Sequence, residues 1–244
     1  MSKLTQELEI IYQDQQLVAI NKPSGLLVHR SNLDRYETRF ALQLLRDQLG
    51  QRVYPVHRLD KPTSGVLLFA LDRETAGVLS EQFRLQQIEK SYLAVVRGWP
   101  DNEGVIDYPL VDGPTKMACG DNSSETPRQA VTNYSTLARV ELPLAVGRYA
   151  SGRYALVEMR PKTGRRHQLR RHFKHIFHPL IGDTSYGDGK HNQLFREQFG
   201  CSRLLLHARQ LLLRQPQNGR SLSLLAPLDR NFEQLLNQLR VTGW

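Results

Sequence analysis

Short apolar runs separated by turn-forming residues account for most of the chain. Runs rich in β-branched and aromatic residues, several with period-two alternation, indicate strands rather than helices. By this pattern we expect strands over residues 9–12, 17–21, 26–29, 53–56, 66–71, 92–96, 131–140, 154–159, 204–213 and 221–225. The last two flank a segment that contains Pro216 and Gly219, so they are expected to form a hairpin.

Helical periodicity is confined to fewer places. Asp72 is a candidate N-cap and Gly50 a candidate C-cap, because a short acceptor side chain starts a helix and glycine ends one. The pattern predicts helices over 37–49, 72–88, a segment that begins at Gly164, and 231–239. Because strands outnumber helices and several are joined as hairpins, the sequence predicts an α+β fold with a mixed, largely antiparallel sheet flanked by helices and loops.

The length and one change of composition bear on domain organisation. The chain has 244 residues, which at roughly 150 residues per domain allows one large domain or two small ones. Gly, Pro, Ser, Asn and Asp dominate residues 112–129, so this segment is expected to be an exposed loop. We expect a single domain over 1–244, in two halves of about 1–111 and 130–244 that the loop joins.

Positive charge is concentrated in one segment. Residues 148–174 contain nine Lys or Arg and one acid, Glu158, which is a net charge of +8, whereas the whole chain carries +9. A cationic surface of this kind is typical of a protein that binds a polyanion. A solvated basic face without a partner gives the same pattern, so charge by itself leaves both interpretations open.

Several protein classes are disfavoured by what the sequence lacks. No apolar run approaches the roughly 18 residues of a membrane span, and the N-terminus has no apolar core of a signal peptide. Two cysteines, Cys119 and Cys201, are too few for a disulfide framework, so a reducing, cytoplasmic setting is expected. No glycine-rich phosphate loop, dinucleotide fingerprint or hydrolase elbow is present, so we expect no nucleotide cofactor.

Four histidines in and after the basic segment, at positions 167, 172, 175 and 178, invite a metal interpretation. Their spacing drifts around a helix, no cysteine accompanies them, and no acid follows until Asp183. Because a zinc site needs three or four convergent ligands, we expect no metal here. The histidines are expected to cap, pack or contact phosphate.

Candidate chemistry begins in the polar block His57-Arg58-Leu59-Asp60-Lys61, which precedes the apolar strand 66–71. The following Pro62 and Gly65 favour a tight turn, and catalytic groups commonly occupy loops that a scaffold holds in place. A free aspartate has a pKa of about 3.9, and neighbouring cations would keep Asp60 ionised as a nucleophile or base. An ordinary surface ion pair is the alternative.

Two further motifs carry residues suited to binding a nucleotide. The run Lys90-x-Tyr92-x-Ala94-x-Val96-x-Gly98 presents a tyrosine, whose face can stack on a base for about 1–3 kcal/mol. A core tyrosine in a strand is the alternative. The run 162–172 reads KTGRRHQLRRH, and a helix with an apolar stripe of Leu169, Phe173 and Ile176 would leave its arginines pointing outward. A helix that begins at Gly164 would also direct backbone N–H groups toward an anion; the alternative is a solvated helix face.

These motifs, in this order, resemble those of the RluA-type pseudouridine synthases. The resemblance implies a pseudouridine synthase fold with a central RNA-binding cleft, and isomerisation of uridine to pseudouridine without cofactor or metal. It implies that Asp60 is the essential aspartate, that Tyr92 packs on the target base, and that Arg165 ion-pairs with Asp60. It implies that Arg58 fills the space vacated by the flipped base and that Leu206 borders the base pocket. The remaining candidates for RNA contact are His57, Lys162, Arg166, His167, Arg170 and Arg171.

Finer resemblance bears on the substrate. Residues 27–31, 147–149 with 153–154, and 161–172 are similar to family members that modify uridine 65 in tRNA. The pair Arg170 and Arg171 matches those members better than the ones that act on ribosomal RNA. At this length we expect none of the additional N-terminal RNA-binding domain that many relatives carry. We therefore expect a monomeric enzyme whose partner is tRNA. A ribosomal RNA enzyme of the same family and a non-catalytic RNA-binding protein remain the alternatives.

Overall fold

The computed structural model describes residues 7–29, 37–111 and 126–241. Its strands are β1 Glu9–Gln13, β2 Leu17–Lys22, β3 Tyr54–Pro55, β4 Ser64–Ala70, β5 Glu89–Arg97, β6 Glu103–Asp107, β7 Val131–Leu142, β8 Gly152–Pro161, β9 Leu206–Arg214 and β10 Ser221–Leu225. Its helices are α1 Ala41–Leu49, α2 Arg73–Arg84, α3 Gln168–His175, α4 Gly189–Phe199 and α5 Arg230–Gln238. The predicted α+β class is confirmed.

One sheet of ten strands runs through the described residues, in the order β1-β2-β4-β9-β5-β8-β7-β6. Strand β10 pairs with β9 and β3 pairs with β4. Every pairing is antiparallel except that of β4 with β9. Gly65 makes this parallel contact possible, because a Cβ at that position would lie 2.1 Å from the carbonyl oxygen of Ala208. The φ of Gly65 is 109°, a value that residues with a side chain rarely adopt. The predicted hairpin of β9 with β10 is confirmed.

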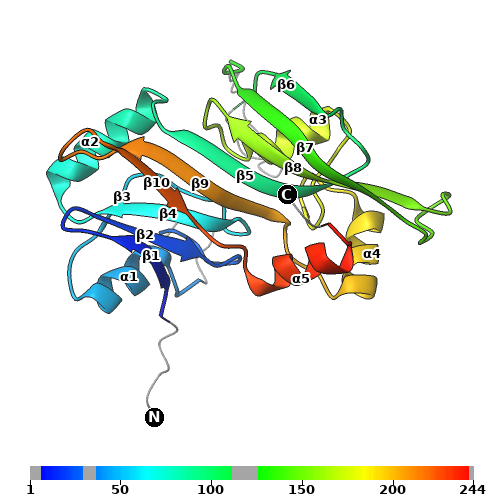
Figure 1. Cartoon of the computed structure of the whole chain (residues 1–244), viewed down its shortest axis with the longest axis horizontal. Helices are drawn as coiled ribbons and strands as arrows, with labels where there is room; N and C mark the ends of the chain where they lie inside the picture. Colours follow the sequence, from blue (N-terminus) through cyan, green and yellow to red (C-terminus); the bar gives the residue numbers. More distant parts are fainter. Residues whose placement is uncertain (1–6, 30–36, 112–125, 242–244) are drawn as a thin grey trace, which may run out of the picture.

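Strands from both sides of residues 112–129 interleave in this sheet. β6 pairs with β7, and β9 lies between β4 and β5. Segments 1–111 and 130–244 therefore do not form separate halves in space. That residues 1–244 form a single domain stays a prediction. Figure 1 shows instead that α1 and α2 lie beside one end of the sheet and that α3 and α4 lie beside the other. Of the loop predicted over 112–129, only 126–129 fall within the described residues, and they are exposed.

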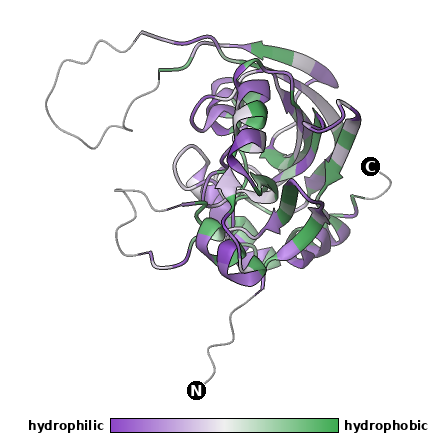
Figure 2. Cartoon of the chain, turned by 90° about the vertical axis from the view of Figure 1, so that its left-hand side faces the viewer, coloured by the Kyte–Doolittle hydropathy of each residue, from purple (hydrophilic) through white to green (hydrophobic). Residues whose placement is uncertain are grey.

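The helices cover the sheet with apolar side chains. At one end of the sheet Leu45 of α1 and Leu79 of α2 belong to separate buried clusters with residues of β2 and β4. At the other end Phe173 of α3 packs with Val157 and Met159 of β8, and α4 and α5 pack around Tyr154. Figure 2 shows hydrophobic and hydrophilic positions alternating along strands and around helices. Burial of these faces, at about 25 cal/mol per Å² of apolar surface, is the main stabilising term.

Several predicted boundaries were wrong. The caps Gly50 and Asp72 are confirmed, but the helices begin or end inside the predicted ranges. No strand forms over 26–29 apart from a bridge of Leu27 to Phe40. Helix α4 and strand β6 were not predicted, because each buries a single residue, Phe195 and Ile106, and so shows no clear local period. Helix α3 begins at Gln168, not at Gly164.

Candidate active site

A cavity of about 1030 Å³ opens where the loop before β4, the end of α2, the start of β5 and the segment before α3 meet. The residues that the sequence singled out and that line it are His57, Arg58, Asp60, Tyr92, Arg165, Arg166, His167, Arg170 and Leu206. Lys162 and Arg171 do not line it. Segments more than a hundred residues apart in sequence therefore contribute to one cleft, which fits the cleft that the resemblance implied.

The loop that carries Asp60 is fastened by backbone contacts. The Nζ of Lys22, a fully buried side chain, donates to the carbonyl oxygens of Pro23, Leu26 and Lys61 at 2.8–3.1 Å. The backbone N–H of Thr63 donates to the carbonyl oxygen of Asp60 at 3.1 Å. These bonds hold the loop in place. None of them uses the Asp60 carboxylate, so that carboxylate stays available to the cleft.

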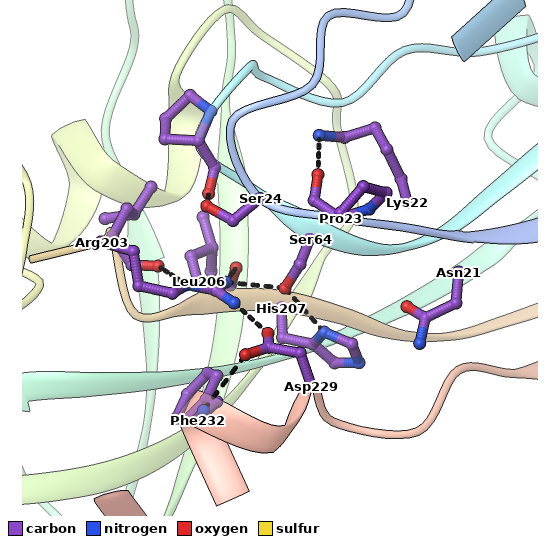
Figure 3. A network of polar contacts seen from close by, with 12 residues as sticks. Asn21, Lys22, Pro23, Ser24, Ser64, Arg203, Leu206, His207, Asp229 and Phe232 are labelled. Carbon is purple, nitrogen blue, oxygen red and sulfur yellow. Dashed lines mark hydrogen bonds and ion pairs between the residues drawn. The ribbon is translucent and has the colours of Figure 1, made fainter. Parts of the chain in front are cut away.

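A polar network lies next to this loop, on the side of α5 (Figure 3). The Oγ of Ser64 accepts a hydrogen bond from Nη2 of Arg203 at 2.7 Å and lies 2.8 Å from Nδ1 of His207. Arg203 also ion-pairs with Asp229, the N-cap of α5. Burial lowers the pKa of His207 to about 4, so this ring is neutral. The network therefore holds the start of β4, which follows the Asp60 loop, against β9.

Arg170 and His167 both lie close to the Asp60 carboxylate. Nη1 of Arg170 lies 3.5 Å from Oδ2 of Asp60, and Nε2 of His167 lies 3.8 Å from Oδ1. Arg170 also holds Asp183 through two hydrogen bonds of 2.7 and 2.8 Å. The Asp183 side chain is completely buried and that of Arg170 is 5% exposed. Burial is the largest influence and opposes ionisation of Asp183, but its bonds to Arg170 and to the backbone N–H groups of Tyr186 and Ser185 together hold its pKa below the usual value.

Two sequence predictions about arginines are corrected by this geometry. Arg165 was expected to pair with Asp60, but its Nε donates to the carbonyl oxygen of Gln129 at 3.0 Å. Arg170 was expected to point outward and contact phosphate, but it is buried between two carboxylates. A helical pattern shows which positions are apolar; it does not show that a counter-ion such as Asp183 lies across from an arginine.

The turn before α3 differs from the predicted helix start. Oε1 of Gln168 accepts hydrogen bonds from the Thr163 hydroxyl at 2.7 Å and from the backbone N–H of Arg165 at 3.0 Å. Nε2 of Gln168 donates to Val131 and Thr132 on β7. These bonds close residues 163–167 into a turn, so Gly164 offers no helix N-terminus to an anion.

Tyr92 borders the cleft from β5. Its ring packs against the clusters that include Leu206 and Leu59. Burial, and then the charge of Asp60, raise the pKa of Tyr92 far above its ordinary value, so its hydroxyl stays protonated. The side chain therefore brings an apolar face and a hydrogen-bond donor to the lining of the cavity.

His57 is held by protein contacts. Its Nε2 accepts a hydrogen bond from the backbone N–H of Leu68 at 2.9 Å, and its ring stacks on Phe83 at 4.7 Å. Burial, and then the charge of Lys90, lower the pKa of His57 to about 3. We therefore interpret His57 as a neutral anchor that ties the Asp60 loop to β4, in place of the RNA contact suggested by the sequence.

The other basic candidates differ in placement. Arg58 and Arg166 are exposed at the cleft. Lys162 is exposed outside it, and Nη1 of Arg171 donates to the carbonyl oxygen of Val111 at 3.0 Å. Burial, and then the charge of Lys162, lower the pKa of Lys90 to about 8, and Lys90 lines the cleft as well. Arg58, Arg166 and Lys90 thus bring positive charge to the lining of the cleft.

The histidines after His167 contact protein groups. Nδ1 of His172 lies 3.0 Å from the Thr132 hydroxyl, His175 stacks on Tyr108, and Nδ1 of His178 lies 2.9 Å from the carbonyl oxygen of Arg97. Within residues 7–29, 37–111 and 126–241, no group of three or more His, Cys, Asp or Glu is placed to hold a metal ion.

Two residues that the sequence did not suggest complete the surroundings of Asp60. Asp183 is the counter-ion of Arg170, and the Tyr186 hydroxyl lies 3.1 Å from Nδ1 of His167. The only local signal for Asp183 is that it is the first acid after a long basic stretch. No periodic pattern in the sequence singles out Tyr186 as a site residue.

Comparison with known proteins decides the family. The sequence profile of RNA pseudouridylate synthases matches residues 16–175. The chain belongs to the RNA pseudouridylate synthase family. Because the enzymes of this family are isomerases, the chain is an isomerase, as the motif resemblance implied.

Relatives of the chain match it along nearly its whole length. A protein of Haemophilus ducreyi named tRNA pseudouridine synthase C is 53% identical over 238 residues, which covers 98% of this chain and 97% of that protein. The protein of the same name from Vibrio cholerae is 52% identical, over 97% and 96% of the two chains. The solved structure of human RNA Pseudouridylate Synthase Domain Containing 4 is 31% identical, with a TM-score of 0.70 over 95% of this chain and 93% of that chain. The predicted pseudouridine synthase fold is confirmed.

No described helix has the length and apolar content needed to cross a membrane.

Proposed function

We propose that this enzyme converts uridine 65 of tRNA to pseudouridine and that Asp60 is its essential aspartate. The observation that carries the proposal is the position of the Asp60 carboxylate, 3.5 Å from the guanidinium of Arg170, in a cavity that Tyr92 and Leu206 also line. Relatives more than 50% identical bear the name tRNA pseudouridine synthase C, which supports tRNA as the substrate.

The reaction rearranges bonds within one nucleotide. The bond from ribose C1′ to N1 of uracil breaks, the base rotates, and a bond from C1′ to C5 forms. The proton leaves C5 and N1 gains a proton, so no atom is added overall. A base inside structured RNA must first be flipped out, at a cost of a few kcal/mol.

The side chains of the cleft suit these steps. An ionised Asp60 can attack the sugar, attack the ring or remove a ribose proton, and each of these roles requires the carboxylate to lie near the nucleoside. Tyr92 offers a face for stacking against the flipped uracil and keeps its hydroxyl proton. Arg58, exposed at the cleft mouth, is suited to occupy the space that the base leaves in the stack.

The test of substrate and position is chemical mapping. Purified enzyme is incubated with unmodified tRNA transcripts and, separately, with ribosomal RNA fragments. We expect pseudouridine at position 65 of tRNA and none in ribosomal RNA. Modification of ribosomal RNA alone would favour the ribosomal alternative, and RNA binding without any modification would favour a non-catalytic role.

Arg166→Ala tests the surface assigned to phosphate contact. Arg166 is exposed at the cleft mouth, so we expect weaker tRNA binding and a salt dependence whose slope is reduced by about one. The matched control is Arg196→Ala on α4, which is exposed and does not line the cavity. Equal slopes for Arg166→Ala and the wild type, measured by filter binding over a range of salt, would remove Arg166 from the phosphate-contacting surface.

A further inference from the structure

His167 occupies an unusual backbone position at the edge of the site. Its φ of 54° and ψ of 27° are left-handed, which is uncommon for a residue other than glycine. This conformation places the ring between two partners. Nε2 lies 3.8 Å from Oδ1 of Asp60, and Nδ1 lies 3.1 Å from the hydroxyl of Tyr186. Which ring nitrogen carries the proton therefore decides whether an N–H or a lone pair of His167 faces Asp60.

The charged groups around His167 come from three places. Asp60 precedes β4, Arg166 and Arg170 flank the residue in sequence, and Asp183 lies beyond α3. Burial is the largest influence and lowers the pKa of His167, so the ring is neutral near pH 7 and carries one N–H.

The partners decide which nitrogen carries that proton. An ionised carboxylate only accepts hydrogen bonds, so the favourable tautomer directs Nε2–H toward Asp60. Nδ1 is then an acceptor, and the Tyr186 hydroxyl is placed to donate to it at 3.1 Å. In the other tautomer a lone pair on Nε2 would face the carboxylate and repel it.

Tyr186 is itself fixed by the residues that hold Arg170. Oδ1 of Asp183 accepts the backbone N–H groups of Ser185 and Tyr186 at 2.9 Å each, while the same carboxylate binds Arg170. The Tyr186 ring lies 5.1 Å from Cζ of Arg170. These contacts do not use the hydroxyl, so the ring would keep its place without it.

We propose that Tyr186 is a positioning residue for the isomerisation: its hydroxyl donates to Nδ1 of His167 and keeps Nε2–H directed at the Asp60 carboxylate. This inference rests on the proposed function, because it assumes that Asp60 acts in its ionised form. Tyr186 does not touch the reacting atoms in this role; it acts through His167.

Tyr186→Phe removes only the hydroxyl and is the direct test. With tRNA labelled with tritium at C5 of uridine, we expect kcat for tritium release to fall about tenfold, the value of one hydrogen bond, with KM unchanged. A merely structural role would instead raise KM or lower the midpoint of urea unfolding, and we expect neither change.

The chain supplies a matched control in a second Tyr–His pair. The hydroxyl of Tyr154 lies 2.9 Å from Nδ1 of His191, and the rings are 5.6 Å apart at 75°. The rings of His167 and Tyr186 are 5.6 Å apart at 70°. Tyr154→Phe loses an equivalent bond away from the cleft, so we expect its kcat and KM to match those of the wild type.

A double-variant cycle separates positioning from damage to the fold. If Tyr186 acts through His167, then adding Tyr186→Phe to His167→Gln should change kcat by less than about twofold. The same tenfold loss on both backgrounds, or a wild-type kcat for Tyr186→Phe, would overturn the inference. Either result leaves the proposed function intact if Asp60→Asn is inactive; a wild-type enzyme that releases no tritium from tRNA would instead contradict the proposed function.

Discussion

Asp60→Asn is expected to abolish pseudouridine formation while tRNA binding persists. The substitution keeps the shape of the side chain but removes the negative charge that attack or proton removal requires, and loss of such a group costs at least about 10²–10⁴ in rate. The fold should tolerate it, because the loop is held through backbone oxygens such as that of Lys61. Tritium release from C5-labelled uridine measures turnover, and filter binding measures affinity.

The control for this variant is another aspartate-to-asparagine change. Asp72 caps α2 by accepting the backbone N–H of Thr75 at 2.8 Å, and asparagine caps a helix about as well. Asp72→Asn should therefore turn over substrate at the wild-type rate. If Asp60→Asn also kept substantial turnover, Asp60 could not be the essential aspartate.

Arg170→Met is expected to give the second large effect, on both stability and activity. It leaves the carboxylate of Asp183 buried without its counter-ion and removes the guanidinium that faces Asp60. Loss of one partner of a buried ion pair costs about 3–5 kcal/mol in free energy of unfolding. We expect a lower midpoint in urea unfolding and no measurable tritium release. Arg170→Lys would not restore either property, since one ammonium cannot reproduce the bidentate contact with Asp183.

A second substitution separates the two effects of Arg170→Met. The double variant Arg170→Met with Asp183→Asn no longer buries an unpaired charge, and the asparagine oxygen can still accept the backbone N–H groups of Ser185 and Tyr186. It should recover most of the lost stability but not the activity. Recovery of turnover in the double variant would show that Arg170 serves only to neutralise Asp183.

How much could be predicted from the sequence depended on the range of the interactions involved. The strand before and the strand after the Asp60 loop, the caps Asp72 and Gly50, and the hairpin of β9 with β10 follow from residues close together in the chain. Helix α4 and strand β6 were missed because their local patterns are weak. Residues 30 and 31, part of a stretch that resembles tRNA enzymes, lie outside the described residues.

The candidate site divides in the same way. The sequence by itself determined which motifs are candidates for the chemistry: a carboxylate in a short loop, an aromatic strand residue and a basic segment, all encoded within short runs. Only the tertiary structure decided that Arg170, not Arg165, faces Asp60, and that Asp183 and Tyr186 stand behind Arg170 and His167. The physical reason is that ion pairing and tautomer choice depend on which groups meet in a buried place, and residues distant in sequence meet only when the chain folds.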